Sequence, residues 1–206
     1  MSLRPRLASI LLAVLLGGCS VLPRVESPDV YLLPGPPAAP APANAIGAKA
    51  SVSLRVDAPQ AGRTLDSSRI AVIPESNVIT VYQGARWSDR APHLLRDRLI
   101  EAFRASASYA AVTSDEANLQ ADLELAGDLR AFQTEYVAGK PVVVIRYDAQ
   151  LLRPHTQTIL ATRQFEVRQA VAGKAVPQVV VAFGQAADAL AAQVVDWADG
   201  ARSGKR

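Results

Sequence analysis

The sequence predicts an α+β fold, a single sandwich domain with two helices packed on one face of an antiparallel or mixed sheet of about six strands. Three observations support this class. The chain has 206 residues, half of them apolar, which suits one well-packed domain and is too short for two. Apolar residues alternate with a period of two in several short segments and recur at spacings of three and four in two longer ones. These segments follow in the order strands, helix, strands, helix.

The first group of strands is predicted between residues 51 and 82. Its segments are 51–57, 70–73 and 78–82. The first alternates apolar and polar residues, as a half-buried strand does, and the other two are rich in β-branched residues. A turn signal that begins at Pro74 separates the last two strands.

A helix is predicted next, with Ser88 as its capping residue and Pro92 in its first turn. Its apolar stripe consists of Leu95, Leu99, Ala102 and Phe103. Three further strands are predicted at 119–132, 142–152 and 158–168. Because the connections between them are short, we expect an antiparallel meander.

The last predicted element is a helix over residues 177–199, with Pro177 in its first turn and Gly200 as a left-handed terminating residue. Its apolar positions include Val180, Phe183, Leu190, Val194 and Trp197. This stripe fits packing on the sheet better than a coiled coil, for which it is short. Residues 202–206 are predicted to form a disordered basic tail.

The first eighteen residues are typical of a lipoprotein signal peptide. Arg4 and Arg6 precede an apolar run over 7–16, and a Leu-Gly-Gly-Cys sequence that resembles the bacterial lipobox ends at Cys19. We therefore expect cleavage between Gly18 and Cys19 and lipidation of Cys19, the only cysteine of the chain. A plain secretory peptide or a buried thiol is the alternative. Ser20 follows, which by similarity to enterobacterial lipoproteins indicates the outer membrane.

Residues 19–50 are predicted to link this lipidated N-terminus to a domain over 51–201. Segment 34–50 holds five prolines among alanines, a composition typical of an extended spacer. The β-prone segment 30–33, which includes Tyr31 and Leu33, is either part of this tether or an edge strand that docks on the domain.

Few residues in the sequence suggest chemistry. His93 and His155 have no second histidine or cysteine nearby, so the sequence predicts no metal site, no cofactor and no catalytic residue. Asp115 and Glu116 are predicted to lie in a solvent-exposed loop. The net charge of +3 is carried largely by the ends of the chain, which argues against a nucleic-acid surface.

The segment from Tyr82 to Asp89 places Arg86 and Trp87 in a predicted loop before the first helix. Arginine and tryptophan are enriched in interface hot spots, so both are candidate partner-binding residues. A tryptophan that closes the core, with Arg86 paired to a local acid, is the alternative.

Several of these features together resemble the ABC-type transport auxiliary lipoprotein family, which includes the paraquat-inducible protein C lipoprotein. The matching residues are Cys19, Tyr31 and Leu33, Val56 and Pro59, Leu65, Ile70 and Ala71, segment 85–89, Leu94, Leu95 and Leu99, segment 158–165, and Trp197. The Pro/Ala spacer is richer in proline than the family pattern.

The resemblance implies a non-enzymatic accessory lipoprotein of an intermembrane phospholipid transport system in a Gram-negative envelope. It would be anchored on the periplasmic face of the outer membrane. Its partners would be a periplasmic protein of the mammalian-cell-entry type and, indirectly, an inner-membrane ABC permease and ATPase, with homo-oligomerisation left open. The alternatives are an assembly lipoprotein for another outer-membrane machine and a lipid-anchored hydrolase.

Overall fold

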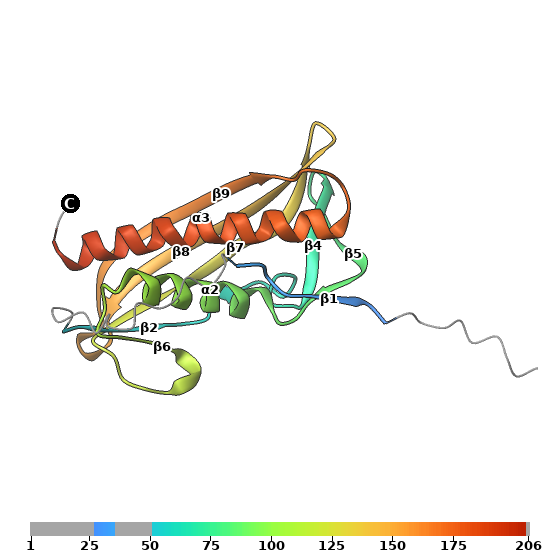
Figure 1. Ribbon diagram of the computed structural model, residues 1–206. Helices are drawn as coiled ribbons and strands as arrows, with labels where there is room; N and C mark the ends of the chain where they lie inside the picture. The colour runs from blue at the N-terminus through green and yellow to red at the C-terminus, as the bar shows by residue number, and fades with distance from the viewer. Residues whose placement is uncertain (1–26, 36–50, 205–206) are drawn as a thin grey trace, which may run out of the picture.

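The structure is a computed structural model that describes residues 27–35 and 51–204 (Figure 1). Its elements are β1 (Asp29–Tyr31), β2 (Ser53–Val56), β3 (Gln60–Ala61), β4 (Arg69–Glu75), β5 (Val78–Trp87), α2 (Ala91–Ser106), β6 (Ala111–Ser114), η1 (Asp115–Ala117), β7 (Leu123–Val137), β8 (Lys140–Arg153), η2 (Pro154–Thr156), β9 (Thr158–Ala170) and α3 (Val176–Arg202). The strands form one mixed sheet, which confirms the predicted α+β class.

The sheet has nine strands, so the predicted number of about six is too low. The additional strands are β1, β3 and β6, which have two to four residues each. A strand this short has too few residues to show a period of two, which is why the sequence pattern did not predict β3 and β6.

The long strand β7 organises the sheet. Along one edge it pairs in succession with β2, β3 and β4, always in parallel, and along the other edge it pairs with β8. β6 extends the sheet beyond β2, while β5 and then β1 extend it beyond β4. The nine strands therefore belong to one sheet, although they are not hydrogen-bonded in a single linear order.

Strands β7, β8 and β9 form an antiparallel meander, as the sequence predicts. The turn between β7 and β8 consists of Ala138 and Gly139, both with positive φ, which suits a tight hairpin with the right-handed twist of its strands. The helical turn η2 and Gln157, also at positive φ, make the second connection.

Helices α2 and α3 lie side by side on one face of the sheet (Figure 1). Their boundaries differ from the predicted ones at two points. The preceding strand continues to Trp87, so that Arg90, not Ser88, occupies the N-cap position of α2, where its side chain makes no capping hydrogen bond. Pro92 lies in the first turn of α2, as predicted.

The last helix continues through Gly200 to Arg202, so its predicted end was wrong. Packing favours this extra turn, because Ala201 contacts the core and the Arg202 guanidinium lies 5.5 Å from the centroid of the Tyr109 ring. Helix α3 is long and apolar enough to span a membrane, but 61% of its most apolar window is buried inside the domain. We therefore interpret it as a core helix.

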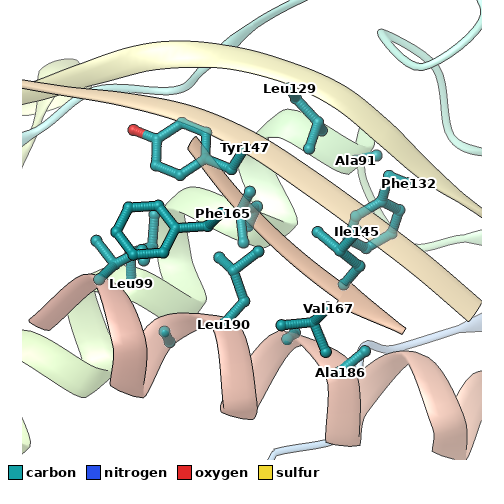
Figure 2. Close-up of a cluster of buried hydrophobic side chains, with 14 of the residues drawn as sticks. Ala91, Leu99, Leu129, Phe132, Ile145, Tyr147, Phe165, Val167, Ala186 and Leu190 are labelled. Atoms are coloured by element: carbon teal, nitrogen blue, oxygen red, sulfur yellow. The ribbon is translucent and has the colours of Figure 1, made fainter. Parts of the chain in front are cut away.

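The core lies between the two helices and the sheet (Figure 2). Leu99 from α2 and Leu190 from α3 point toward Phe165, Tyr147 and Ile145 of the sheet, and these side chains are at most 2% exposed. Tyr147 donates its hydroxyl proton to the carbonyl oxygen of Ala126 at 3.0 Å. Burial raises the pKa of Tyr147, so this hydroxyl stays protonated at neutral pH.

Candidate functional site

Arg86 and Trp87 are the last two residues of β5 and not part of a loop, which corrects their predicted setting. Trp87 is 1% exposed, and its ring packs edge-on against Phe183 of α3 and Phe132 of β7, with centroids 5.1 and 6.0 Å away. Trp87 is therefore a core residue. Arg86 is exposed, and because successive residues of a strand alternate, it projects from the opposite face of the sheet.

The same end of β5 binds the N-terminal segment of the domain. Strand β1 pairs in parallel with it, so that Val30 lies beside Arg86 and Tyr31 lies beside Trp87. The backbone N–H of Ser88 donates to the carbonyl oxygen of Tyr31 at 2.8 Å. Residues 29–31 thus form an edge strand of the domain, where the β-prone segment of the sequence is 30–33, and the first described part of the chain is tied to the candidate residues.

Beyond β1, the chain is held by a buried arginine of α2. The Arg98 side chain is 6% exposed, and it donates to the carbonyl oxygens of Pro34 and Leu33 at 2.8 and 3.3 Å. The same guanidinium donates to the Asp188 carboxylate of α3 at 2.6 Å. One side chain therefore joins the N-terminal segment to both helices. We call residues 29–35 the N-terminal clasp.

A glycine in α3 makes room for this clasp. Gly184 is buried, and a Cβ atom built on it would lie 2.6 Å from the carbonyl oxygen of Pro34. No side chain fits at that distance without moving the backbone of the clasp. Gly184 is thus required by the close approach of Pro34 and not by its own helical conformation.

On the open face of the sheet, Arg86 has a second arginine as its neighbour. Arg69 of β4 lies directly opposite Arg86 in the antiparallel β4–β5 pair, and both residues are exposed. Like charges at directly opposed positions repel each other. Guanidinium groups bind carboxylate and phosphate groups, and we call Arg69 and Arg86 the arginine pair.

The two histidines lie on different elements, His93 in the first turn of α2 and His155 in η2. His93 Nδ1 lies 3.2 Å from the Asp89 carboxylate, an arrangement that in hydrolases orients the base. However, the Arg90 guanidinium lies 2.8 Å from His93 Nε2, where the hydroxyl of a nucleophile would have to be. Burial alone would raise the pKa of Asp89, but bonds from the Arg90 N–H and from His93 outweigh it and lower that pKa.

Asp115 and Glu116, predicted as a solvated loop, instead bind a buried arginine. Arg96 is 4% exposed, and one of its terminal nitrogens lies 3.1 Å from Asp115 and 2.7 Å from Glu116. Burial by itself lowers the pKa of Arg96, but its bonds to Glu116, Asp97 and Asp115 outweigh burial and raise it. These contacts fix the η1 turn against α2.

Three residues of this region were not predicted from the sequence: Arg98, Gly184 and Asp188. The sequence holds a signal that Arg98 is buried and paired, because it lies next to Leu95 and Leu99 of the apolar helix stripe. An arginine on a buried helix face needs an acidic or carbonyl partner. Within residues 27–35 and 51–204, no three His, Cys, Asp or Glu side chains are grouped as a metal site would require. Gly18 and Cys19 lie outside the described residues.

Comparisons with known proteins agree on the family of the chain. A family model described as ABC-type transport auxiliary lipoprotein component matches residues 31–195. A crystal structure of a Xanthomonas campestris protein assigned to the DUF330 family is 31% identical, with a TM-score of 0.72. That alignment covers 85% of this chain and 98% of that chain.

A second crystal structure, titled as an uncharacterized protein, is similar in fold alone. It is 16% identical, has a TM-score of 0.65, and covers 84% of this chain and 99% of that chain. A search of curated proteins finds no match to the chain.

Proposed function

Since the chain belongs to the ABC-type transport auxiliary lipoprotein family, we propose that it is the outer-membrane-anchored, non-enzymatic accessory subunit of an ABC-type lipid transport system. The observation that carries this proposal is the family match, which begins at Tyr31 inside the N-terminal clasp. The lipobox sequence ends at Cys19, ten residues before β1 begins. The clasp therefore ties the chain that follows the lipidated cysteine to the sheet and to both helices.

The proposed partner is a periplasmic protein of the mammalian-cell-entry type. An anchored domain that acts without chemistry must act through its surface, and the arginine pair is an exposed charged feature next to the clasp. Two opposed guanidinium groups repel each other, and an acidic side chain of a partner relieves that repulsion. We therefore place the docking site for the periplasmic partner at Arg69 and Arg86.

Affinity capture of the full chain from detergent-extracted membranes tests this proposal. The tagged lipoprotein is expressed at native level, and the proteins that copurify with it are identified by mass spectrometry. We expect a protein of the mammalian-cell-entry type in the capture. A Cys19→Ala variant is the matched control for capture that depends on the anchor.

Two outcomes would overturn the proposal. Capture of an outer-membrane barrel without any mammalian-cell-entry protein would indicate an assembly lipoprotein instead. Loss of the transport phenotype on substitution of His93 or His155 by Ala, with folding intact, would indicate a hydrolase. The contact of His93 with Arg90 favours the opposite result, a variant that retains function.

A further inference from the structure

Several connections between elements lie at the same end of the sheet. β7 runs parallel to β4, so Val137 and Glu75 end their strands on the same side. The meander reverses direction twice, and β9 therefore finishes at this end also, where α3 begins. Figure 1 shows the β7–β8 turn, the β4–β5 turn and the start of α3 together at the right of the molecule.

This end carries large apolar side chains that are open to solvent. Val78, Ile79, Val137 and Val181 are each between 44% and 53% exposed. We call these four residues the apolar end. A groove of about 540 Å³ lies beside Val181, between the end of β9 and the first turns of α3, and its lining combines apolar residues such as Val171 and Pro177 with three glutamines, Gln169, Gln178 and Gln185. Clustered exposed apolar residues mark an interaction surface.

The direction in which the chain enters the domain relates this surface to the anchor. β1 is parallel to β5, with Asp29 beside Ala85. The chain before Asp29 therefore enters from the side on which β5 begins, at Val78. The apolar end and the point of entry thus share one side of the molecule (Figure 1).

The length of chain ahead of β1 limits how far this end can lie from a membrane. Nine residues lie between Cys19 and Asp29, and the ten Cα-to-Cα steps that join them span at most about 35 Å when fully extended. Val78 precedes Ala85 by seven positions in β5, a separation of at most about 23 Å, which Gly84 at positive φ and the register shifts of the β4–β5 pair shorten. An anchor at Cys19 therefore lies at most about 35 Å from the start of β1, on the side of the molecule that carries the apolar end.

We propose that the apolar end rests on the lipid surface, with Val78, Ile79, Val137 and Val181 inserted at the level of the headgroups. Lys140 and Lys174 are exposed at this end together with Glu75, so the balance of formal charge suits an anionic membrane. This inference rests on the lipid anchor of the proposed function. It adds that the domain is held in one orientation, with the apolar end toward the membrane, and does not turn freely on its tether.

Site-specific probes on the lipidated full chain test this orientation. Acylation occupies the thiol of Cys19, the only cysteine of the chain, so an introduced cysteine is the unique site for a polarity-sensitive fluorophore. Ile79→Cys and Val137→Cys report on the apolar end. Leu119→Cys and Ile159→Cys are matched controls, because these residues are 58% and 56% exposed at the opposite end of the sheet.

The labelled proteins are placed on vesicles of phosphatidylethanolamine and phosphatidylglycerol, and quenching by iodide is measured. We expect several-fold weaker quenching and a blue-shifted emission at positions 79 and 137, and free quenching at 119 and 159. Equal quenching at all four positions on a vesicle-bound protein would overturn the orientation and leave the anchor intact. A chain that is not lipidated and does not bind vesicles would overturn both proposals. Protection that rises with the surface density of the protein would indicate contact between copies and would also overturn lipid contact.

Discussion

Arg86 and Arg69 place two positive charges at directly opposed positions on the open face of the sheet. Because their repulsion opposes folding, Arg86→Ala is expected to leave the free energy of unfolding unchanged or slightly higher, within about 0.5 kcal/mol. Binding should respond differently. Loss of a hot-spot arginine costs about 2 kcal/mol, roughly a thirtyfold loss of affinity for the periplasmic partner, which quantitative copurification measures.

Arg153→Ala is the matched control for this experiment, since Arg153 is an exposed arginine at the far end of β8. It should bind the partner as the parent does. Circular dichroism must show that all variants are folded. A folded Arg86→Ala variant with parental affinity would contradict the docking site.

Gly184 allows a test in which the sign of the effect is informative. Replacing a glycine inside a helix by alanine ordinarily stabilises a protein by about 0.5–1 kcal/mol. Here the added Cβ would lie 2.6 Å from the Pro34 carbonyl oxygen, so we expect Gly184→Ala to lower the melting temperature and to expose the clasp to proteolysis. An increase in melting temperature would mean that the clasp does not dock in this position.

At the level of single residues, the sequence shows which side chains are unusual but not whether they are buried or which groups they contact. The tryptophan at position 87 could be recognised as special, but its burial depends on Phe132 and Phe183, which are distant in the chain. Arg98 lies in the predicted first helix, but the sequence pattern does not single it out. Its role depends on Pro34 and Asp188, and no local pattern brings those two groups together.

The two helices can be tested by truncating their buried faces. Leu99 and Val194 are 0% exposed, and each lies in the apolar stripe predicted for its helix. Leu99→Ala is expected to cost about 2–4 kcal/mol through lost burial and a cavity, and Val194→Ala about 1–3 kcal/mol. Chemical denaturation measures both values. Val181→Ala, at a position 52% exposed in α3, should cost less than about 0.5 kcal/mol, and a loss as large as that of Val194→Ala would contradict the helix orientation.

The η1 turn makes part of the stability depend on pH. Burial alone would raise the pKa of Asp115, but bonds from the Ala58 N–H and from Arg96 outweigh it and lower that pKa. Because the pKa of Asp115 is lower in the folded state, the ionised carboxylate stabilises the fold at pH values above the ordinary aspartate pKa of about 4. This contribution is lost as the pH falls through the folded-state pKa. Asp115→Asn should therefore be less stable than the parent at pH 7, and the difference should shrink as the pH falls from 4 to 3. Urea unfolding at both values measures the difference, and a constant difference would contradict the assignment.

At the scale of elements, periodicity predicted the strands of the meander and both helices, because each is long enough to show its period. It underestimated β5, which was predicted to end at residue 82 and continues to Trp87. Gln83, Gly84 and Arg86 have no clear β-preference. They are held in the sheet by pairing with β4 and β1, which is tertiary context that a local pattern does not contain.

The anchor concerns the molecule as a whole, because it determines where the domain acts. Cys19→Ala removes the thiol that lipidation requires, so the variant is expected to remain an unprocessed precursor that no longer fractionates with the outer membrane. Fractionation followed by immunoblotting measures this, with Ser20→Ala as a control that keeps the cysteine. If the domain of the Cys19→Ala variant still sediments with the outer membrane after processing, the lipidation prediction is wrong.

The position of β7 also determines the order in which the chain can fold. The strands that pair along one of its edges, β2, β3 and β4, precede it by some sixty to seventy residues, whereas β8 and β9 follow it through short turns. Closing a short loop costs less entropy than closing a long one, so the C-terminal meander can form first. During synthesis β2 and β3 emerge well before residues 123–129 of β7, with which they pair. Throughout that interval the nascent chain exposes unpaired strand edges, the kind of surface that holdase chaperones protect from aggregation.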